Sequence, residues 1–256
     1  MTADLQAFLD LGASGVQHAL VVFLRIAAAV ALLPAFGERS VPVRVRLAIA
    51  LAFTVVVAPI VPDTEQSLAI ERFIPLLATE TLIGLVFGLG FRFLVMALQI
   101  AGSIAAQSTS LAQIFGGASV EPMPAIGHVL LVAGLALAAM TGLHVRLTEA
   151  FIVSYIDFPA GILMDPGQLT EFTVARVGHA FGLAVSLAAP FLLASFVYNF
   201  ALGAINRAMP QLMVVLIGAP AITGASLAFL AIFSPHLLRV WLGALDAALA
   251  NPFGLP

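Results

Sequence analysis

Three charged side chains interrupt apolar stretches of the sequence, and they are the residues whose placement most suggests chemistry. Arg25 stands in the first apolar run, and Glu80 and Arg92 stand in the third. A charge near the centre of a bilayer costs about 2.5 to 3.5 kcal/mol on insertion scales unless it is paired or hydrated. We therefore expect all three to face protein or water. Arg25 either snorkels or pairs with a carboxylate on a neighbouring helix, and we favour the pairing; the alternative is an assembly contact or a cavity-lining group.

Signatures of catalysis are missing from the sequence. It contains no H-E-x-x-H, no G-x-S-x-G and no P-loop. There is no cysteine, which excludes thiolate ligands and a cysteine nucleophile. The five histidines are dispersed without the spacing of metal ligands: His18, His128, His144, His179 and His236. We expect no enzymatic activity, no metal site and no cofactor.

Composition indicates a membrane protein. Of the 256 residues, 62% are hydrophobic and 9% are charged, with a mean hydropathy of +1.13. A soluble domain of this size could not bury so many apolar side chains. The net charge is only -3 and the ten basic residues, all arginine, are scattered, so we expect no nucleic-acid partner. The first fifteen residues contain no Lys or Arg, which makes them a poor signal peptide.

Six apolar runs approach the roughly 20 residues that cross a hydrocarbon core. They are Val16 to Phe36, Leu47 to Val61, Phe73 to Ala97, Ile126 to Tyr155, Val174 to Ala204 and Leu212 to Leu245, and the last run could also form two segments. Arginines cluster in the first connection, whereas the second and fourth are mainly acidic. The positive-inside rule then predicts an outside N-terminus with odd-numbered connections in the cytoplasm.

The third run is longer than a bilayer requires. Helical character continues to about Phe115, which makes roughly 43 residues or about 65 Å. Glu80, Gly84, Gly88 and Arg92 follow one another at i+4, and the two glycines form a small-xxx-small motif that favours close helix packing.

Local patterns elsewhere predict bends and a surface pair. Pro190 and the Gly218, Ala219, Pro220 step interrupt later apolar runs, so we expect kinked helices there. Arg146 and Glu149 have the spacing of a pair on a helix surface.

The segment from Ala106 to Pro124 reads as a long connection. It contains the paired glycines Gly116 and Gly117 and then two prolines one residue apart. Such residues permit backbone conformations that others avoid, and Phe115 and Met123 supply apolar side chains. Taken alone, these residues favour a surface connection over a mobile gate.

Four stretches closely resemble the FliR family of flagellar biosynthetic proteins. They are L-R-I-A at 24 to 27, the run from Glu38 to Pro59, F-P-A-G at 158 to 161, and the run from Leu202 to Pro220. The resemblance extends from about Leu24 to the C-terminal region. It implies an all-α, polytopic membrane protein with long, kinked helices, in which a FliP-like portion (1–173) precedes a FliQ-like helical hairpin (174–256).

The resemblance also implies an assembly. Members of this family join FliP and FliQ in the flagellar type III export gate of the bacterial inner membrane, contact FlhB, and lie near FlhA and the basal-body ring protein FliF. Unfolded flagellar subunits would pass through this gate, which is partly raised toward the periplasm, and lipid would cover some of the surface. Alternatives are the equivalent gate subunit of a virulence secretion system, a secondary transporter, and a purely structural scaffold.

Functional residues follow from the same resemblance. The family carries a channel plug where this chain has Gln113, Ile114, Phe115, Gly116, Gly117 and Ala118. Its basic turn after the first helix corresponds to Arg39, Pro42, Arg44 and Arg46, and a later turn corresponds to Asn206, Arg207 and Pro210. With Arg25, Glu80 and Arg92, these are the expected fold or assembly determinants.

Overall fold

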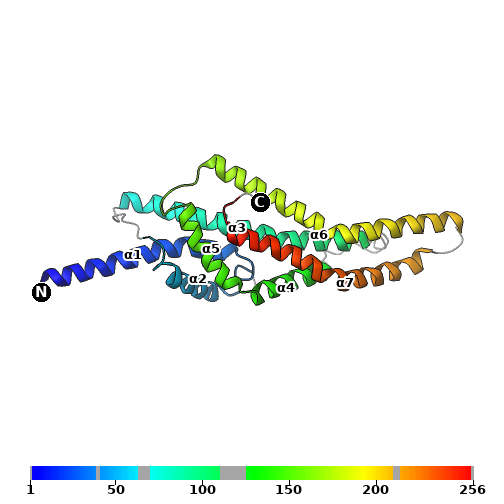
Figure 1. Cartoon of the computed structure of the whole chain (residues 1–256), viewed down its shortest axis with the longest axis horizontal. Helices are drawn as coiled ribbons and strands as arrows, with labels where there is room; N and C mark the ends of the chain where they lie inside the picture. Colours follow the sequence, from blue (N-terminus) through cyan, green and yellow to red (C-terminus); the bar gives the residue numbers. More distant parts are fainter. Residues whose placement is uncertain (1, 39–40, 63–69, 110–124, 210–213, 255–256) are drawn as a thin grey trace. The chain divides into compact units, whose positions relative to one another are not determined.

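The described part of the chain folds into α-helices. The computed structural model describes residues 2–38, 41–62, 70–109, 125–209 and 214–254, and in these ranges it contains seven α-helices and no strand (Figure 1). The helices are α1 (Thr2–Leu32), α2 (Val43–Val57), α3 (Ile70–Thr109), α4 (Ala125–Met140), α5 (Leu143–Asp157), α6 (Pro166–Ala208) and α7 (Val214–Ala250). The predicted all-α fold is confirmed.

Fewer helices reach membrane length than the six predicted runs. Among the residues that the structure describes, four helical segments are long and apolar enough to cross a bilayer: Ser14–Leu32, Ile74–Gln107, Pro166–Ala208 and Gly224–Ala250. The second predicted run forms α2, which has only 15 residues, or about 22 Å, against a hydrocarbon core of roughly 30 Å. The second predicted run is therefore not among the candidate spans, whereas the predicted sides of the N-terminus and of the connections stay predictions.

The fourth predicted run is interrupted. It divides into α4 and α5 at Thr141 and Gly142, and the pair counts at most as one broken span. Gly142 adopts φ +83°, a left-handed conformation that glycine takes at no steric cost. By contrast, α6 continues as one helix through Pro190, and α3 follows its prediction closely, with 40 residues up to Thr109.

Two compact units make up the described structure. Unit 1 comprises 1–93, 141–177 and 245–256, and unit 2 comprises 94–140 and 178–244. Helices α3, α6 and α7 each pass from one unit into the other along the chain.

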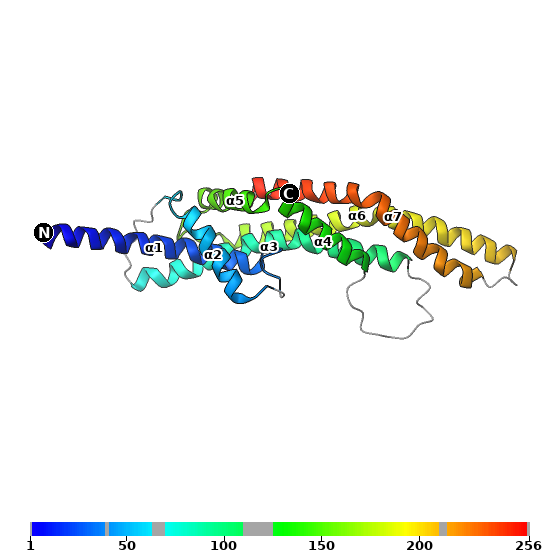
Figure 2. The ribbon, with the colours of Figure 1, turned by 90° about the horizontal axis from the view of Figure 1, so that it is seen from below.

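Unit 1 is built around α1. This helix packs against α2, which also contacts α5, and Figure 2 shows α1 and α2 side by side. On its other flank α1 meets α3 at the predicted glycine motif. A β-carbon at Gly84 would lie 2.1 Å from the Arg25 carbonyl oxygen, and one at Gly88 would lie 2.6 Å from that of Ala29. The motif therefore serves helix packing, as the sequence indicates.

Aromatic side chains fill the centre of unit 1. Phe87 on α3 stacks on Phe151 of α5 with ring centroids 4.7 Å apart, and Phe53 of α2 meets Phe151 edge-on at 5.6 Å. Such pairs add about 0.5 to 1.5 kcal/mol beyond the apolar area they bury. They join α2, α3 and α5 into one core.

Unit 2 has its own close helix contact. A β-carbon at Gly102 on α3 would lie 2.1 Å from the Gly127 α-carbon on α4, so these two backbones nearly touch. Trp241 of α7 is completely buried, and its indole N–H donates to the Leu94 carbonyl at 2.8 Å. These contacts hold α3, α4 and α7 together within the unit.

Candidate functional site

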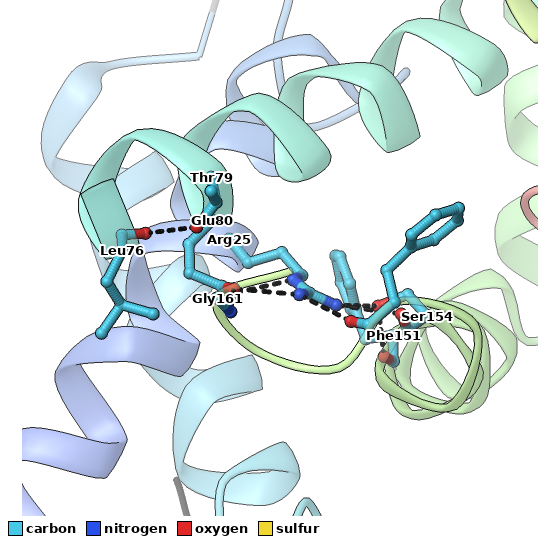
Figure 3. A network of polar contacts seen from close by, with 8 residues as sticks. Arg25, Leu76, Thr79, Glu80, Phe151, Ser154 and Gly161 are labelled. Atoms are coloured by element: carbon cyan, nitrogen blue, oxygen red, sulfur yellow. Dashed lines mark hydrogen bonds and ion pairs between the residues drawn. The ribbon is translucent and has the colours of Figure 1, made fainter. Parts of the chain in front are cut away.

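Arg25 and Glu80 form an ion pair in the interior of unit 1. Arg25 Nε donates to Glu80 Oε2 at 2.8 Å, and Nη2 donates to Oε1 at 3.1 Å. Both side chains are 0% exposed. Figure 3 shows the two residues reaching toward each other from α1 and α3. This confirms that Arg25 pairs with a carboxylate on a neighbouring helix.

The remaining donors of Arg25 reach α5 and the turn that follows it. Nη1 donates to the Ser154 carbonyl and Nη2 to the Phe158 carbonyl, each at 2.9 Å. The guanidinium carbon lies 3.7 Å from the centroid of the Tyr155 ring, a cation–π contact. In return, the Gly161 backbone N–H donates to Glu80 Oε1 at 3.0 Å. We name these six residues the Arg25 cluster.

Local conformation makes the cluster possible. Gly161 has φ +81°, which lets its N–H point at Glu80 without a side-chain clash. Ser154 Oγ donates to the carbonyl of Phe151 within α5, as Figure 3 also shows. The two carboxylate oxygens and all three guanidinium nitrogens thus have partners, and this is the condition under which a buried ion pair is tolerated.

Arg92 has a different partner from Glu80. Its Nη1 donates to Glu38 Oε1, and both side chains are about 30% exposed. The two charges on the predicted stripe of α3 therefore serve separate contacts. The expectation that Arg92 faces protein is confirmed, but it lies nearer the surface than Arg25.

The basic turn before α2 is held by one of its arginines. Arg46 donates to the carbonyls of Val41 and Glu38 at 3.1 and 2.8 Å, which fixes the approach to α2. Pro42 is the N-cap residue of α2, where proline loses no helical hydrogen bond. Arg44 is exposed, and Arg39 lies outside the described residues.

The other two predicted groups of residues, the turn after α6 and the channel plug, are exposed or lie outside the described residues. Asn206 and Arg207 are exposed near the end of α6, and Pro210 lies outside the described residues. The predicted plug, Gln113 to Ala118, also lies outside them. Their predicted roles remain predictions.

Sequence reasoning paired Arg146 with the wrong carboxylate. Arg146 on α5 donates to Asp246 near the end of α7, both within unit 1. The i+3 spacing to Glu149 suggested a local pair, but an arginine side chain half-exposed on a helix reaches whichever carboxylate the tertiary fold brings near. A separation of 100 residues gave no sequence signal.

A second buried arginine was not predicted. Arg176 on α6 is only 5% exposed, and its Nη2 donates to the carbonyls of Asn251, Pro252 and Gly254 at 3.2, 3.0 and 2.9 Å. It therefore binds the turn that directly follows α7, near the carbonyl end of the helix, where cations are favourable. The only signal in the sequence is an arginine inside an apolar run, the same signal that Arg25 gives.

Neither arginine site has the arrangement of a catalytic centre. In the ranges that the structure describes, no three His, Cys, Asp or Glu side chains group as a metal site. Both oxygens of Glu80 accept hydrogen bonds from Arg25 or Gly161 within the protein. The geometry is that of a connector between helices.

Comparison with known proteins identifies the family to which the chain belongs. The profile of the family described as bacterial export proteins, family 1, matches residues 16–248. The chain belongs to this bacterial export family.

Individual relatives agree with the family match. The chain is 30% identical over 230 residues to the flagellar biosynthetic protein FliR of Caulobacter vibrioides, covering 88% of this chain and 92% of that protein. It is 30% identical over 207 residues to FliR of Bacillus subtilis, with coverage of 78% and 80%. FliR of Escherichia coli is 28% identical over 216 residues, with coverage of 83% and 82%.

The export-family match contains the whole Arg25 cluster. Two of the stretches that carry the resemblance, 24–27 and 158–161, meet there through Arg25, Phe158 and Gly161. Asn251 to Gly254, which Arg176 binds, follow the matched range. In this export-family chain the cluster thus joins segments that are 133 residues apart.

Proposed function

We propose that this chain is a core subunit of the flagellar type III protein export gate. With FliP- and FliQ-type subunits it would form the channel through which unfolded flagellar subunits cross the inner membrane. The observation that carries the proposal is the family match over residues 16–248, together with relatives that are flagellar biosynthetic proteins. Those names favour a flagellar gate over its virulence counterpart.

The surface of the chain supports a multi-subunit setting. Large apolar side chains are exposed on several helices, including Val55 on α2 at 72% and Phe196 and Phe200 on α6 at 71% and 74%. Soluble monomers rarely expose contiguous apolar surface of this kind. Lipid and neighbouring subunits would cover these faces. Because α2 is too short to span a bilayer, its exposed apolar side chains would be covered by a neighbouring subunit.

The internal charges support a fixed rather than a substrate-binding role for unit 1. A secondary transporter binds its substrate near the bilayer midplane through groups that are available to it. In the Arg25 cluster the guanidinium of Arg25 and the carboxylate of Glu80 are occupied by each other and by backbone groups. The chain would therefore form part of the wall of a passage. Other components would supply the energy for export.

The proposal includes three finer assignments. Residues 1–173 would form the FliP-like portion and residues 174–256 the FliQ-like hairpin. The connection from Ala106 to Pro124 would close the channel at rest, with Phe115 as its apolar contact. The assembled gate, with FlhB beside it and FlhA and FliF nearby, would stand partly raised toward the periplasm.

Export in living cells tests the main proposal. Deleting the gene from its flagellated host should abolish secretion of hook and filament proteins, and a plasmid copy should restore it. Immunoblots of the culture medium measure both. Normal secretion by the deletion strain would overturn the proposal.

Conductance tests the plug separately. Deleting Gln113 to Ala118, or replacing Phe115 with Gly, should make the closed gate leak ions when the assembled complex is reconstituted in a planar bilayer. Ser110→Gly, in the same connection, is the control and should leave the conductance low. A conductance that stays low in the deletion variant would refute the plug while leaving the export function intact.

A further inference from the structure

Arg176 is buried in unit 1 without an acidic partner. It is only 5% exposed, and it forms no ion pair with the described residues. Arg25, the other buried arginine of this unit, has the carboxylate of Glu80 as its counterion. A buried charge is tolerated when it is paired and its donors are satisfied. Within the described part of the chain, the charge of Arg176 therefore lacks a counterion.

The hydrogen bonds of Arg176 are also unevenly distributed. Nη2 carries two hydrogens, yet the carbonyls of Asn251, Pro252 and Gly254 all accept from it, at 3.2, 3.0 and 2.9 Å. Nε is buried and has no hydrogen-bond partner among the described residues. In Arg25 the same two nitrogens, Nε and Nη2, donate to the two oxygens of one carboxylate. The corresponding edge of Arg176 has the donors for an oxyanion but binds only neutral carbonyls.

Residues 251–254, which we name the lid, lie over Arg176 through these three contacts. Phe253 of the lid packs against the buried cluster that contains Met164 and Phe172. The guanidinium carbon of Arg176 lies 5.1 Å from the centroid of the Phe172 ring, so the charge and the apolar seat of Phe253 are adjacent. The lid thus presents an apolar group with oxygen atoms beside it. An anion of the same form would add the missing negative charge.

We propose that the lid covers a binding site for an amphiphilic anion, such as a fatty acid or an anionic lipid. The carboxylate or phosphate group would bind Nε and Nη2 of Arg176 in the bidentate geometry that a guanidinium favours, and the apolar part would take the seat of Phe253. Displacing Phe253 forfeits limited apolar contact, because this side chain is only half-buried. The site is independent of the proposed export function.

Photolabelling of the full chain tests the site. The probe is a long-chain fatty acid that carries a diazirine, added to the chain in an uncharged detergent, and mass spectrometry locates the label. We expect labelling between Met164 and Arg176, and little from the matching fatty alcohol, which has no charge. Equal labelling by the alcohol would overturn the proposal.

Competition identifies the bound group. Displacement of the probe by unlabelled oleate supports a carboxylate, and displacement by phosphatidylglycerol supports a lipid phosphate as well. Displacement by neither, or by inorganic phosphate alone, would refute an amphiphilic ligand.

Substitution of the arginine tests its role. Arg176→Gln should reduce the labelling about tenfold, because hydrogen bonds between charged groups are the strong ones. Arg176→Lys, which keeps the charge but loses the bidentate edge, should retain more of it. Arg239→Gln, the same change at an exposed arginine of α7 in unit 2, is the control and should have no effect. Unchanged labelling of Arg176→Gln would overturn the proposal.

The lid supplies a test that does not depend on the folding of Arg176→Gln. Phe253→Ala weakens the competitor for the seat, so labelling should rise about tenfold, which corresponds to about 1.4 kcal/mol. In the wild-type chain, oleate should speed chymotrypsin cleavage after Phe253, because the lid must leave when the anion binds. Labelling that does not rise in Phe253→Ala, or cleavage that oleate leaves unchanged, would count against the site.

Discussion

Arg25 and Glu80 hold each other by two hydrogen bonds, of 2.8 and 3.1 Å, although neither side chain has any exposed surface. They belong to α1 and α3, and the same guanidinium also binds backbone carbonyls at Ser154 and Phe158. One side chain therefore connects three helices and the turn that follows α5. The pair is a structural requirement of unit 1 because neither charge could remain buried alone.

Removing either charge should destabilise unit 1 severely. In Arg25→Met the carboxylate of Glu80 loses its counterion, and we expect a loss of about 3 to 5 kcal/mol. Thermal unfolding of the purified chain in detergent and its level in the membrane measure this. Arg44→Met, at an exposed position on α2, should behave as wild type. The double variant Arg25→Met/Glu80→Leu should be more stable than Arg25→Met, and equal instability of the two would contradict the ion-pair interpretation.

The glycines of α3 should differ sharply in their tolerance of alanine. A β-carbon at Gly84 would lie 2.1 Å from the Arg25 carbonyl oxygen, whereas one at Gly90 would meet only the Phe172 ring at 3.6 Å. Gly84→Ala must push α1 away, and overpacking of this kind costs about 1 to 3 kcal/mol. Gly90→Ala should be neutral or slightly stabilising. Melting temperatures that fall equally in both variants would show that the α1–α3 contact is not the cause.

Residue type and periodicity predicted much of the fold. The long apolar runs correctly gave an all-helical membrane protein, the length of α3, and the close approach at Gly84. The error at α2 arose because an apolar run of 15 residues has the composition of a span without its length. The division between α4 and α5 depends on the backbone conformation of Gly142. The presence of a glycine in an apolar run does not by itself predict that conformation.

The partners of the arginines could be predicted only in part, because tertiary contacts determine them. A lone arginine in an apolar run demands a partner, so the pairing of Arg25 could be expected from desolvation alone. Its identity could not, since Glu80 is 55 residues away and the carbonyl of Phe158 is 133 away. Arg146 was assigned to Glu149 because local spacing was the only information available, and tertiary contact with Asp246 replaced it.

Fluorescence should confirm the environment of Trp241. Because it is the only tryptophan and is completely buried, its emission should be blue-shifted and resistant to acrylamide. Trp241→Phe removes the hydrogen bond to the Leu94 carbonyl and should destabilise unit 2 by at least about 1 kcal/mol. An emission maximum typical of water, or rapid quenching in the folded chain, would contradict the contact between α7 and α3.

The segment after α7 should be held in place by one aromatic side chain and one arginine. Phe253 contacts the rings of Phe158, Phe172 and Phe87, with centroids 4.8, 5.9 and 6.2 Å away. Arg176 binds three carbonyls of the same segment. We expect Phe253→Ala to cost about 2 kcal/mol, less than the 3 to 5 of a fully buried phenylalanine, because Phe253 is only half-buried.

Two controls assign that loss to docking of the segment. Phe200→Ala, at a side chain that is 74% exposed, should leave the melting temperature of the isolated chain unchanged. Arg176→Lys should retain more stability than Arg176→Gln, because an ammonium group can still donate to the carbonyls of Pro252 and Gly254. The same variants should make the bond after Phe253 susceptible to chymotrypsin in the order Gln, then Lys, then wild type. Equal protection in all three would mean that the aromatic contacts alone hold the segment.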